Sequence, residues 1–435
     1  MKKINALRAT VVAAVLATTS AAWATDGYFP HGFGMKSKGM GGASVAVTDN
    51  AFAGINNPAA SAWAGNRADL GLDIFMPKRS AARSAPGFGG MLEGDVKSDG
   101  SAFAIPEFAY NAKIDDRRSW GVTVYGNGGM NTEYPGDNVM CMNPNTGQPY
   151  LGNLLCGQGK LGVDLMQLII APTFAYKIDA QHSVGVSPLL VVQQFSATGL
   201  DAFASFSMAP DKVSNTGTDR STGAGVRLGY LGQLSDTLKF GATYSPKIKM
   251  GKFDEYAGLF ASAGSFDIPE NYALGVNVQV TPAVSVAADY SRVNYSGVIS
   301  IGNPMSQLMA GNPMGSADGP GFGWSDVSVF KLGVQWQATP TMVLRVGYNQ
   351  STNPVKPENV TFNILAPGVI KQHYTLGGTY ALTKDSEFTW AYMYAPKNTV
   401  TGASMYNGML PGASGITETV RMSQQSLGVQ YSWKF

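Results

Sequence analysis

The sequence predicts an all-β fold, namely a closed antiparallel β-barrel of fourteen strands that spans a membrane. Three observations point to this fold: a strictly alternating C-terminal segment, an export signal at the N-terminus, and no later apolar run near the roughly 18 residues that a membrane helix needs. Without such helices a chain crosses a bilayer only as a closed barrel, because backbone polar groups in lipid need partners within the protein. A large secreted β-protein is the alternative.

Residues 424–435 are the last expected strand. Its apolar face carries Leu427, Val429, Tyr431, Trp433 and Phe435. Alternation with period 2 gives a strand one apolar and one polar face, and aromatic residues at the strand end suit a membrane interface. A terminal Phe on such a strand resembles the assembly signal of outer-membrane barrels. We therefore expect the barrel-assembly machinery, outer-membrane lipid and lipopolysaccharide as partners.

The N-terminal 24 residues read as a signal peptide. Lys2, Lys3 and Arg8 precede an apolar stretch at 9–17, and the small-x-small pattern at 22–24 predicts cleavage after Ala24. The apolar stretch is too short to span a bilayer as a helix. We therefore expect an exported protein of the Gram-negative outer membrane.

The composition argues against nucleic acid as a partner. The formal net charge is +2, but the signal peptide supplies three basic residues and no acidic ones, so the remaining chain is close to neutral. Only 14% of residues are charged, while 53 are glycine and 11% are aromatic. This balance also excludes a polybasic protein of the membrane surface.

Alternating segments recur along residues 68–435, the expected barrel domain. They lie at 68–77, 102–113, 119–126, 164–178, 182–195, 223–234, 238–250, 266–280, 284–295, 325–337, 342–350, 372–382, 387–396 and 424–435. Short connections with Asp, Ser, Thr and Pro turn residues alternate with long ones rich in Gly, Pro, Asn and Met. Bacterial barrels have short periplasmic turns, long extracellular loops and an even strand number. Both chain ends are thus expected on the periplasmic side.

The alternation also assigns side chains to the two faces of the wall. Phe330, Leu332, Val334 and Trp336 should face lipid, and Phe388 to Tyr394 should make an aromatic outer row. A charge facing the bilayer midplane costs roughly 2–4 kcal/mol, so Arg227, Lys331 and Arg345 should face the lumen. They either belong to a solvated, salt-bridged wall or bind a ligand carboxylate.

Cys141 and Cys156 are the two cysteines, and both lie in a Gly/Pro/Asn-rich stretch. In an oxidising compartment we expect one disulfide across a loop. A metal or redox site is not expected, because the spacing is not C-x-x-C and no histidine lies nearby.

Residues 25–67 do not alternate. Gly-rich turns separate short pieces suited to one- or two-turn helices. A fourteen-stranded barrel is too wide for its own side chains to fill, so an internal plug makes physical sense. We therefore expect this segment to be a hatch inside the lumen.

At this point the chain resembles the FadL-like outer-membrane transporters of long-chain fatty acids and hydrophobic hydrocarbons. The resemblance rests on residues 34–43, on 49–51 and especially on Asn57-Pro58-Ala59 in the hatch. Residues 119–124 with Asn127-Gly128-Gly129, together with 269–275 and 344–348, also look like family segments.

The resemblance implies a mechanism. Substrate would adsorb to apolar extracellular loops, bind inside against the hatch, and leave into the bilayer through a lateral gap at a kink in the third strand. Transport would be diffusive, without a cofactor, by a monomer.

Several residues fit these roles on physical grounds. Gly126, Gly128 and Gly129 mark either a kink, since glycines in strands signal bulges, or simply a loop start.

Candidates for the ligand site in the hatch are Phe29, Phe33, Met35, Met40 and Phe52. The alternative is that they only pack the plug against the wall. Candidates for the adsorption patch are Met305, Leu308, Met309, Met314 and Phe322. Packing between loops is the competing explanation there.

Other functions fit less well. The three histidines, His31, His182 and His373, are scattered, so neither a nucleophile–His–acid site nor a metal cluster is expected, and the protein should not be an enzyme. A general porin for small polar solutes and a surface adhesin remain alternatives. The sequence does not decide between a carboxylated lipid and a neutral hydrocarbon.

Overall fold

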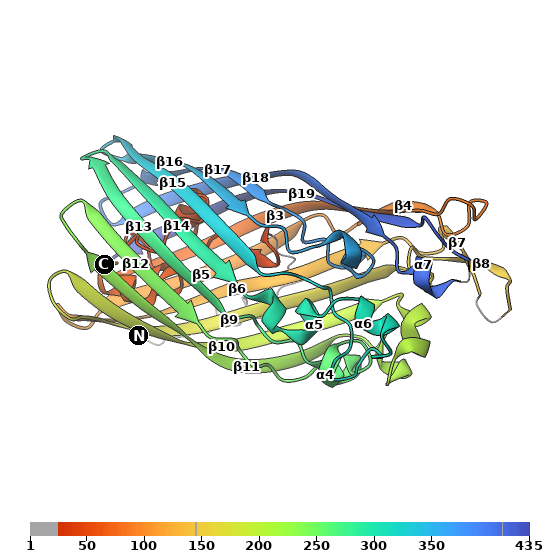
Figure 1. Ribbon diagram of the computed structural model, residues 1–435. Helices are drawn as coiled ribbons and strands as arrows, with labels where there is room; N and C mark the ends of the chain where they lie inside the picture. The colour runs from red at the N-terminus through yellow and green to blue at the C-terminus, as the bar shows by residue number, and fades with distance from the viewer. Residues whose placement is uncertain (1–24, 144–145, 411) are drawn as a thin grey trace, which may run out of the picture.

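A computed structural model describes residues 25–143, 146–410 and 412–435. The expected signal peptide lies outside these residues. Within them, fourteen long strands form one closed barrel (Figure 1). They are β3 (Arg67–Ser84), β5 (Phe103–Lys113), β6 (Arg118–Tyr134), β9 (Leu161–Lys177), β10 (His182–Thr198), β11 (Asp219–Gln233), β12 (Leu238–Ser245), β13 (Asn271–Thr281), β14 (Val284–Val293), β15 (Val327–Thr339), β16 (Met342–Ser351), β17 (Gln372–Ala381), β18 (Ser386–Ala403) and β19 (Thr417–Lys434).

The strands follow one another around the barrel in chain order, each antiparallel to the next. Pairing of β19 with β3, from Thr417↔Ser84 to Lys434↔Arg67, closes the circle. The expected fourteen-stranded barrel is thereby confirmed, and each expected segment overlaps one of these strands.

Some expected strand boundaries were wrong. β6 continues to Tyr134, so Gly126, Gly128 and Gly129 lie inside a strand and not at the start of a loop. β12 ends at Ser245 and β13 begins at Asn271, because residues 246–270 leave the wall to join the loops. Two isolated bridges, Ile248↔Ile268 and Gly223↔Met250, continue the strand directions there.

The short turns use the side-chain chemistry that the sequence predicted. In the β5–β6 turn, Asp115 Oδ1 accepts hydrogen bonds from the backbone N–H groups of Arg117 and Arg118. Asp179 does the same in the β9–β10 turn, and the hydroxyls of Ser235, Thr281, Thr339 and Thr383 accept from turn N–H groups in four others. These local bonds satisfy backbone donors that the strands leave free.

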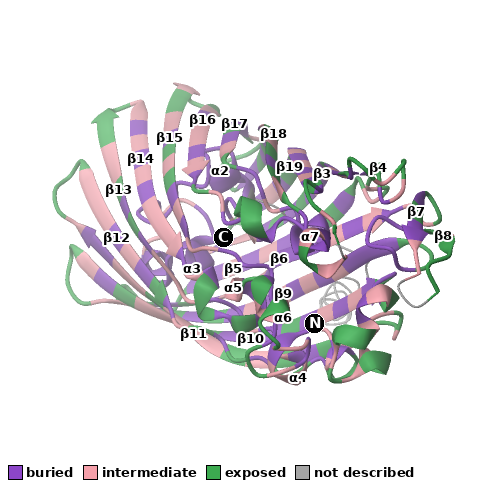
Figure 2. Ribbon diagram, turned by 45° about the vertical axis from the view of Figure 1, so that its right-hand side comes forward, coloured by how far each residue is buried: buried purple, intermediate pink, exposed green. Residues whose placement is uncertain are grey.

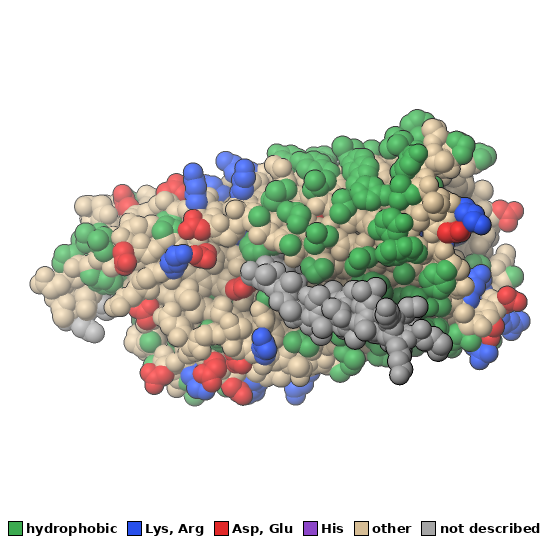
Figure 3. Space-filling view, turned by 180° about the vertical axis from the view of Figure 1, so that it is seen from behind, with side chains coloured by type: hydrophobic (Ala, Val, Ile, Leu, Met, Phe, Trp, Pro, Cys, Tyr) green, Lys and Arg blue, Asp and Glu red, His purple; other side chains and the backbone are tan. Residues whose placement is uncertain are grey.

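The predicted faces of the wall are confirmed. Phe330, Leu332 and Trp336 expose 61%, 48% and 49% of their surface, whereas Arg345 and Asn349 on the opposite face are buried. Figure 3 shows hydrophobic side chains gathered over one stretch of the barrel wall, with charged side chains beyond it. In the described part of the chain, no helix combines the length and apolarity needed to cross a bilayer.

Short helices and strands crowd the end opposite the short turns. There lie β4 (Gly94–Lys97), β7 (Val139–Met142), β8 (Pro149–Gly152), η2 (Asp201–Phe206), η3 (Pro210–Lys212), η4 (Asp254–Tyr256), α4 (Ala261–Gly264), η5 (Tyr295–Gly297), α5 (Ile299–Gly302), α6 (Ser306–Met309), η6 (Pro357–Asn359), η7 (Phe362–Ile364) and α7 (Tyr406–Met409). The expected disulfide joins Cys141 of β7 to Cys156, with Cα atoms 5.7 Å apart.

The segment before β3 fills the lumen. It contains β1 (Thr25–Asp26), β2 (Phe29–Pro30), α2 (Met35–Lys38), α3 (Ala53–Asn56) and η1 (Pro58–Ala62). Figure 2 shows α2 and α3 enclosed by the barrel strands and buried. The hatch, defined here as residues 25–66, thus occupies the place that its lack of alternation predicted.

Inward-facing glycines let the hatch backbone lie directly against the wall. A Cβ added at Gly347 of β16 would overlap the backbone nitrogen of Gly41, and one at Gly377 of β17 would lie 3.0 Å from Cα of Gly39. Similar contacts with hatch atoms occur at Gly185, Gly229, Gly241, Gly333 and Gly428. Several of these glycines pair across neighbouring strands, such as Gly185↔Gly229 and Gly333↔Gly347. The glycines therefore form a girdle, and the hatch fits within it.

Replacing Gly347 with Ala should loosen the hatch. The new methyl group would force residues 40–41 away from the wall, which opens a water path along β16. We expect higher single-channel ion conductance in planar bilayers, while the heat-modifiable migration of the folded barrel is retained.

Gly297→Ala is the matched control, because a Cβ at Gly297 meets no atom within 4 Å. A variant that lacks residues 25–66, and therefore the whole hatch, should give the highest conductance and serves as the upper reference. Equal conductance for Gly347→Ala and the natural protein would contradict the role of the girdle.

Candidate functional site

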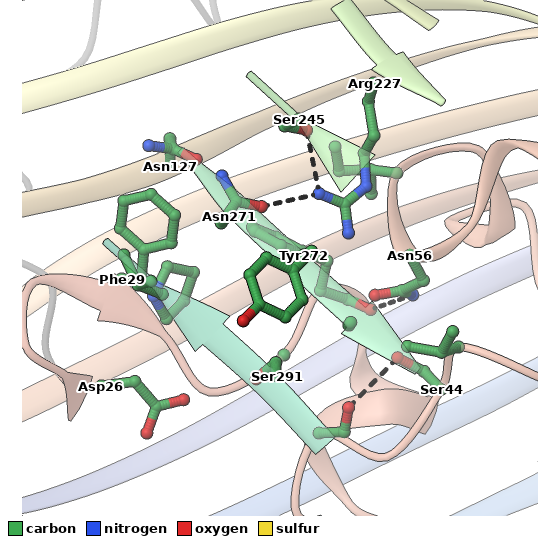
Figure 4. A pocket seen from close by; sticks show the side chains of 18 of the residues that line it. Asp26, Phe29, Ser44, Asn56, Asn127, Arg227, Ser245, Asn271, Tyr272 and Ser291 are labelled. Carbon is green, nitrogen blue, oxygen red and sulfur yellow. Dashed lines mark hydrogen bonds between the residues drawn. The ribbon is translucent and has the colours of Figure 1, made fainter. Parts of the chain in front are cut away.

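A cavity lies between the hatch and the wall formed by β6 and β9–β15 (Figure 4). One side is apolar and is lined by Phe29, Phe33, Ile55, Tyr125, Ile169, Leu189, Ile248 and Ile268. The other side is polar and is lined by Asp26, Ser44, Arg227, Ser245, Asn271, Asp289, Ser291 and Lys331. We call it the central cavity. Its lining suits a ligand that is largely hydrophobic and carries a polar group.

Aromatic side chains shape the apolar side. The Phe33 ring meets Tyr125 edge-on, with centroids 4.7 Å apart. Of the five hatch residues expected at a ligand site, Phe29 and Phe33 line the central cavity. The other three pack the hatch, since Met35 lies against Gly428, Met40 against Gly333, and Phe52 against Gly34.

The three inward cations proposed from the sequence have different surroundings. Arg345 does not line the central cavity; it donates to Gln335 and Thr379 at 2.7 Å and lies 3.9 Å from Asp49. Lys331 lines the cavity but is engaged by the hatch, donating to the His31 carbonyl at 2.8 Å and lying 3.8 Å from the Asp26 carboxylate.

Arg227 of β11 also lines the cavity, and all its acceptors are neutral. It donates to Ser245 Oγ at 3.2 Å, to Asn271 Oδ1 at 2.9 Å and to Thr243 Oγ1 at 3.0 Å. Figure 4 shows its side chain directed toward Ser245 and Asn271. Among the described residues, no carboxylate lies within 4.0 Å of Arg227 to compensate its charge at the wall of the cavity.

Buried ion pairs fasten the hatch to β3, β5 and β18, which are strands that do not line the central cavity. Lys38 Nζ lies 2.9 Å from Asp73 and 3.2 Å from Glu107, and Lys36 Nζ lies 2.7 Å from Glu387. All of these side chains are at most 7% exposed. Sequence reasoning did not find these acidic partners, although their inward positions in alternating strands were a signal available to it.

The Asn57-Pro58-Ala59 motif joins the hatch to β11. Asn57 Nδ2 donates to the carbonyls of Val45 and Tyr230, at 2.8 and 2.9 Å, while Oδ1 accepts from the Ala59 N–H and caps η1. Gly185 and Gly229 leave room for this turn. The motif is therefore a structural clamp.

A second clamp holds the first residues of the hatch. The Tyr295 hydroxyl accepts from the N–H groups of Tyr28 and Phe29, and donates to the Asp26 carbonyl at 2.6 Å. Burial raises the pKa of the Asp26 carboxyl to about 6, against the opposing effect of Lys331. Residues 25–33, which we call the strap, are thus held by one loop tyrosine, by Lys331 of the wall, and by Asp26, whose carboxylate is costly to ionise.

The hydrogen-bond ladder of the wall is interrupted beside the strap. Pairing of β5 with β6 ends at Phe108↔Val124, so β6 beyond Val124 pairs only with β9. In that pairing the register shifts between Gly126 and Gly128, which leaves Asn127 as a bulge. A Cβ at Gly128 would overlap the Tyr28 carbonyl, so the strap lies directly against the bulge.

A second cavity, which we call the outer cavity, is apolar and lies among the loops at the end of the barrel opposite the short turns. It is lined by Leu155, Val163, Phe195, Leu200, Phe203, Leu259, Phe260, Ser300, Met314, Pro320, Gly321, Phe322, Phe362 and Leu365. Two residues of the expected adsorption patch, Met314 and Phe322, line this outer cavity. Met305 is buried among the loops, and Leu308 packs against the same hydrophobic cluster. Met309 is 53% exposed. Ring contacts Phe260–Phe266–Tyr28–Phe29, with centroids 5.0 to 6.3 Å apart, connect the outer cavity to the central one.

A fourteen-stranded barrel with a hydrophobic belt and a lumen filled by an N-terminal hatch defines an outer-membrane channel protein. The particular family follows from the sequence comparison. The chain belongs to the outer membrane protein transport protein family (OMPP1/FadL/TodX), whose model matches residues 14–435. The resemblance to FadL-like proteins is thereby confirmed. A comparison with curated protein sequences found no match.

Solved structures of similar fold agree with this architecture. The Pseudomonas putida toluene transporter TodX superposes with a TM-score of 0.64 at 21% identity, covering 94% of this chain and 100% of that one. A Pseudomonas aeruginosa FadL homologue gives 0.69 at 15% identity, with 94% and 100% covered. The Ralstonia pickettii toluene transporter TbuX gives 0.61 at 19% identity, with 93% and 99% covered.

Replacing Lys38 with Met should destabilise the protein. It leaves Asp73 and Glu107 buried without a cation, which costs about 3–5 kcal/mol for a broken buried pair. The measurement is the free energy of unfolding in urea, followed by heat-modifiable migration, together with limited proteolysis of the hatch.

The control is Lys384→Met, because the side chain of Lys384 is 90% exposed and 4.0 Å from Asp385. That variant should change the free energy of unfolding by less than about 0.5 kcal/mol. Adding Asp73→Asn and Glu107→Gln to Lys38→Met should recover much of the loss. A Lys38→Met protein as stable as the Lys384→Met control would contradict the anchoring role.

Proposed function

We propose that this protein is an outer-membrane channel for the passive uptake of hydrophobic compounds. The observation that carries the proposal is the central cavity, whose apolar side runs along β6, β9 and β10 to the bulge where the wall is discontinuous. A hydrophobic molecule in this cavity thus lies beside a route to the bilayer that avoids water.

Entry begins in the outer cavity. Its lining is almost entirely apolar, and a concave apolar lining suits a hydrophobic ligand. Phenylalanine and methionine side chains accept hydrophobic molecules of different shapes. The ring contacts through Phe266 and Tyr28 provide an apolar connection from there to the central cavity.

Release takes place sideways. The periplasmic side of the hatch is fastened to the wall by buried ion pairs of Lys36 and Lys38, so moving it would expose several unpaired charges. The strap is held by weaker contacts and lies against the bulge at Gly128. Displacement of the strap by substrate would uncover the discontinuity between β5 and β6.

The filled lumen favours this function over the alternatives. A porin for polar solutes needs an open polar channel, whereas here residues 25–66 are packed against the girdle of glycines. An adhesin would not need the central cavity. The likeness in fold to structures titled as toluene transporters supports a hydrophobic cargo.

Deleting Asn127 should abolish uptake while leaving the barrel intact. The deletion lets Gly126 and Gly128 continue the ladder opposite Leu168 and Gln167 without a bulge. Uptake of labelled oleate and of labelled toluene is measured in a strain that lacks the protein, and in the same strain carrying the natural or the deleted form. At least one compound should enter several-fold faster with the natural protein than in the strain that lacks it. With the Asn127 deletion, that compound should enter no faster than in the strain that lacks the protein.

The matched control is deletion of Gly89, an exposed residue of the loop between β3 and β4 at which an added Cβ would meet no atom within 4 Å. It should keep uptake near that of the natural protein. If neither compound enters faster with the natural protein, the transport proposal fails; if the Asn127 deletion transports normally, lateral release at β6 fails.

A further inference from the structure

We infer that the outer surface of β3, β18 and β19 binds the phosphate groups of lipopolysaccharide, the phosphorylated glycolipid of the outer leaflet, at a cluster of basic side chains on the loop side of the hydrophobic belt. The cluster, which we call the rim patch, consists of Lys78, Lys97, Lys371, Lys397 and Arg421. Figure 3 shows lysine and arginine side chains at the loop-side border of the hydrophobic belt. The inference goes beyond the proposed function, because it concerns the membrane around the barrel and not the compound that passes through it.

The end of the hydrophobic belt fixes the depth of the rim patch in the membrane. Tyr374 and Tyr394 expose 48% and 43% of their surface and pair across β17 and β18 in one row around the barrel. The same row continues through Gln425 of β19 to Met76 of β3. Aromatic residues mark the interfaces of such barrels with the bilayer, and the long loops are extracellular. The row therefore lies at the boundary between hydrocarbon and head groups in the outer leaflet.

The basic side chains occupy the next two rows toward the loops. Lys78 lies two residues beyond Met76 on the outward face of β3 and is exposed. One row further, Ser80 pairs with Lys97 of β4 on one side and with Arg421 of β19 on the other. Alternate residues of a strand are about 7 Å apart, so these cations lie within the head-group layer.

Lys397 and Lys371 extend the patch across β18 to β17. Lys397 is exposed at a bulge, where the register of β18 against β19 shifts just before Asn398. Asn398 Nδ2 donates to the Val369 carbonyl at 2.6 Å, which places residues 369–371 beside the bulge. The five cations thus spread over neighbouring strands on one side of the barrel.

The rim patch has little compensating negative charge. In the described part of the chain, no carboxylate lies within 4.0 Å of its four lysines, and Arg421 has Asp95 at 3.7 Å, a side chain that is itself 68% exposed. Farther around the barrel, the outward Arg292 of β14 is paired with Asp326 at 2.9 Å. Neighbouring like charges repel one another, so an anion that bridges them is favoured.

Hydroxyl groups between the cations favour a glycolipid over a simple anion. Ser423 pairs with Lys78, and Thr399 pairs with Arg421. Hydroxyls bond to phosphate and to sugar oxygens alike. The outward residues next in the belt, such as Leu427, are apolar and can contact acyl chains. The phosphates, sugars and acyl chains of one molecule therefore each meet a matching surface.

The test is lipid binding to the purified full-length protein in dodecyl maltoside, followed by native mass spectrometry. Three probes are titrated: lipid A with two phosphates, the same lipid A without phosphates, and phosphatidylglycerol. We expect the diphosphorylated lipid A to have the lowest Kd. Its advantage should shrink as the salt concentration rises, because exposed charges are screened.

Lys78→Gln combined with Lys397→Gln should raise the Kd for diphosphorylated lipid A about 10- to 30-fold, as expected for the loss of two lysines that face anionic head groups. The matched control is Lys247→Gln combined with Lys252→Gln, which removes two exposed lysines from the connection between β12 and β13. The control should bind lipid A like the natural protein. Heat-modifiable migration checks that each variant is folded.

Equal Kd values for the natural protein and the Lys78/Lys397 variant would overturn the inference. An equal loss of affinity in the control would also overturn it, because net charge alone would then explain binding. If lipid A without phosphates or phosphatidylglycerol bound as tightly as the diphosphorylated form, a phosphorylated glycolipid would be refuted as the occupant. None of these results bears on the proposed uptake, which the Asn127 deletion tests separately.

Discussion

The contact between the hatch backbone and the inner wall of the barrel is the constraint on which the other features depend. A fourteen-stranded barrel has a lumen too wide to be filled by its own side chains, so the hatch supplies the missing packing. At the contact points the wall strands carry glycines, so no wall side chain holds the backbone of the hatch away from the backbone of the wall.

The close contact has an electrostatic consequence. Once Lys36 and Lys38 are pressed against the wall, their charges are buried and must be neutralised there, and Asp73, Glu107 and Glu387 do this. Removing one partner of such a pair costs more than the pair contributes, which makes this half of the hatch hard to move. The strap is held by the Tyr295 hydroxyl and by Lys331, which lies 3.8 Å from the Asp26 carboxylate and donates to the His31 carbonyl. In the proposed function, the hatch is therefore fixed on one side and displaceable on the other.

The displaceable side borders both the central cavity and the place where β5 and β6 part. Binding, gating and release can thus share one small region, in which Phe29 and Tyr28 belong to the strap, Tyr125 to β6 and Arg227 to the wall opposite. A ligand that fills the cavity competes directly with the strap for space.

By itself, the sequence determined the strand number, the faces of the wall, the short turns, the disulfide and the presence of a plug, because each follows from a local period or from neighbouring residues. Only the tertiary structure decided which cations are free. Arg67 and Glu387 form one buried pair although 320 positions separate them, and Arg227, Lys331 and Arg345 look alike in sequence. The same holds for the apolar hatch residues. Phe29 and Phe33 line the cavity, whereas Met35 and Met40 lie against the wall and Phe52 packs within the hatch. Local alternation specifies the side of a strand on which a residue lies, whereas its partner depends on how the closed barrel and the folded hatch meet.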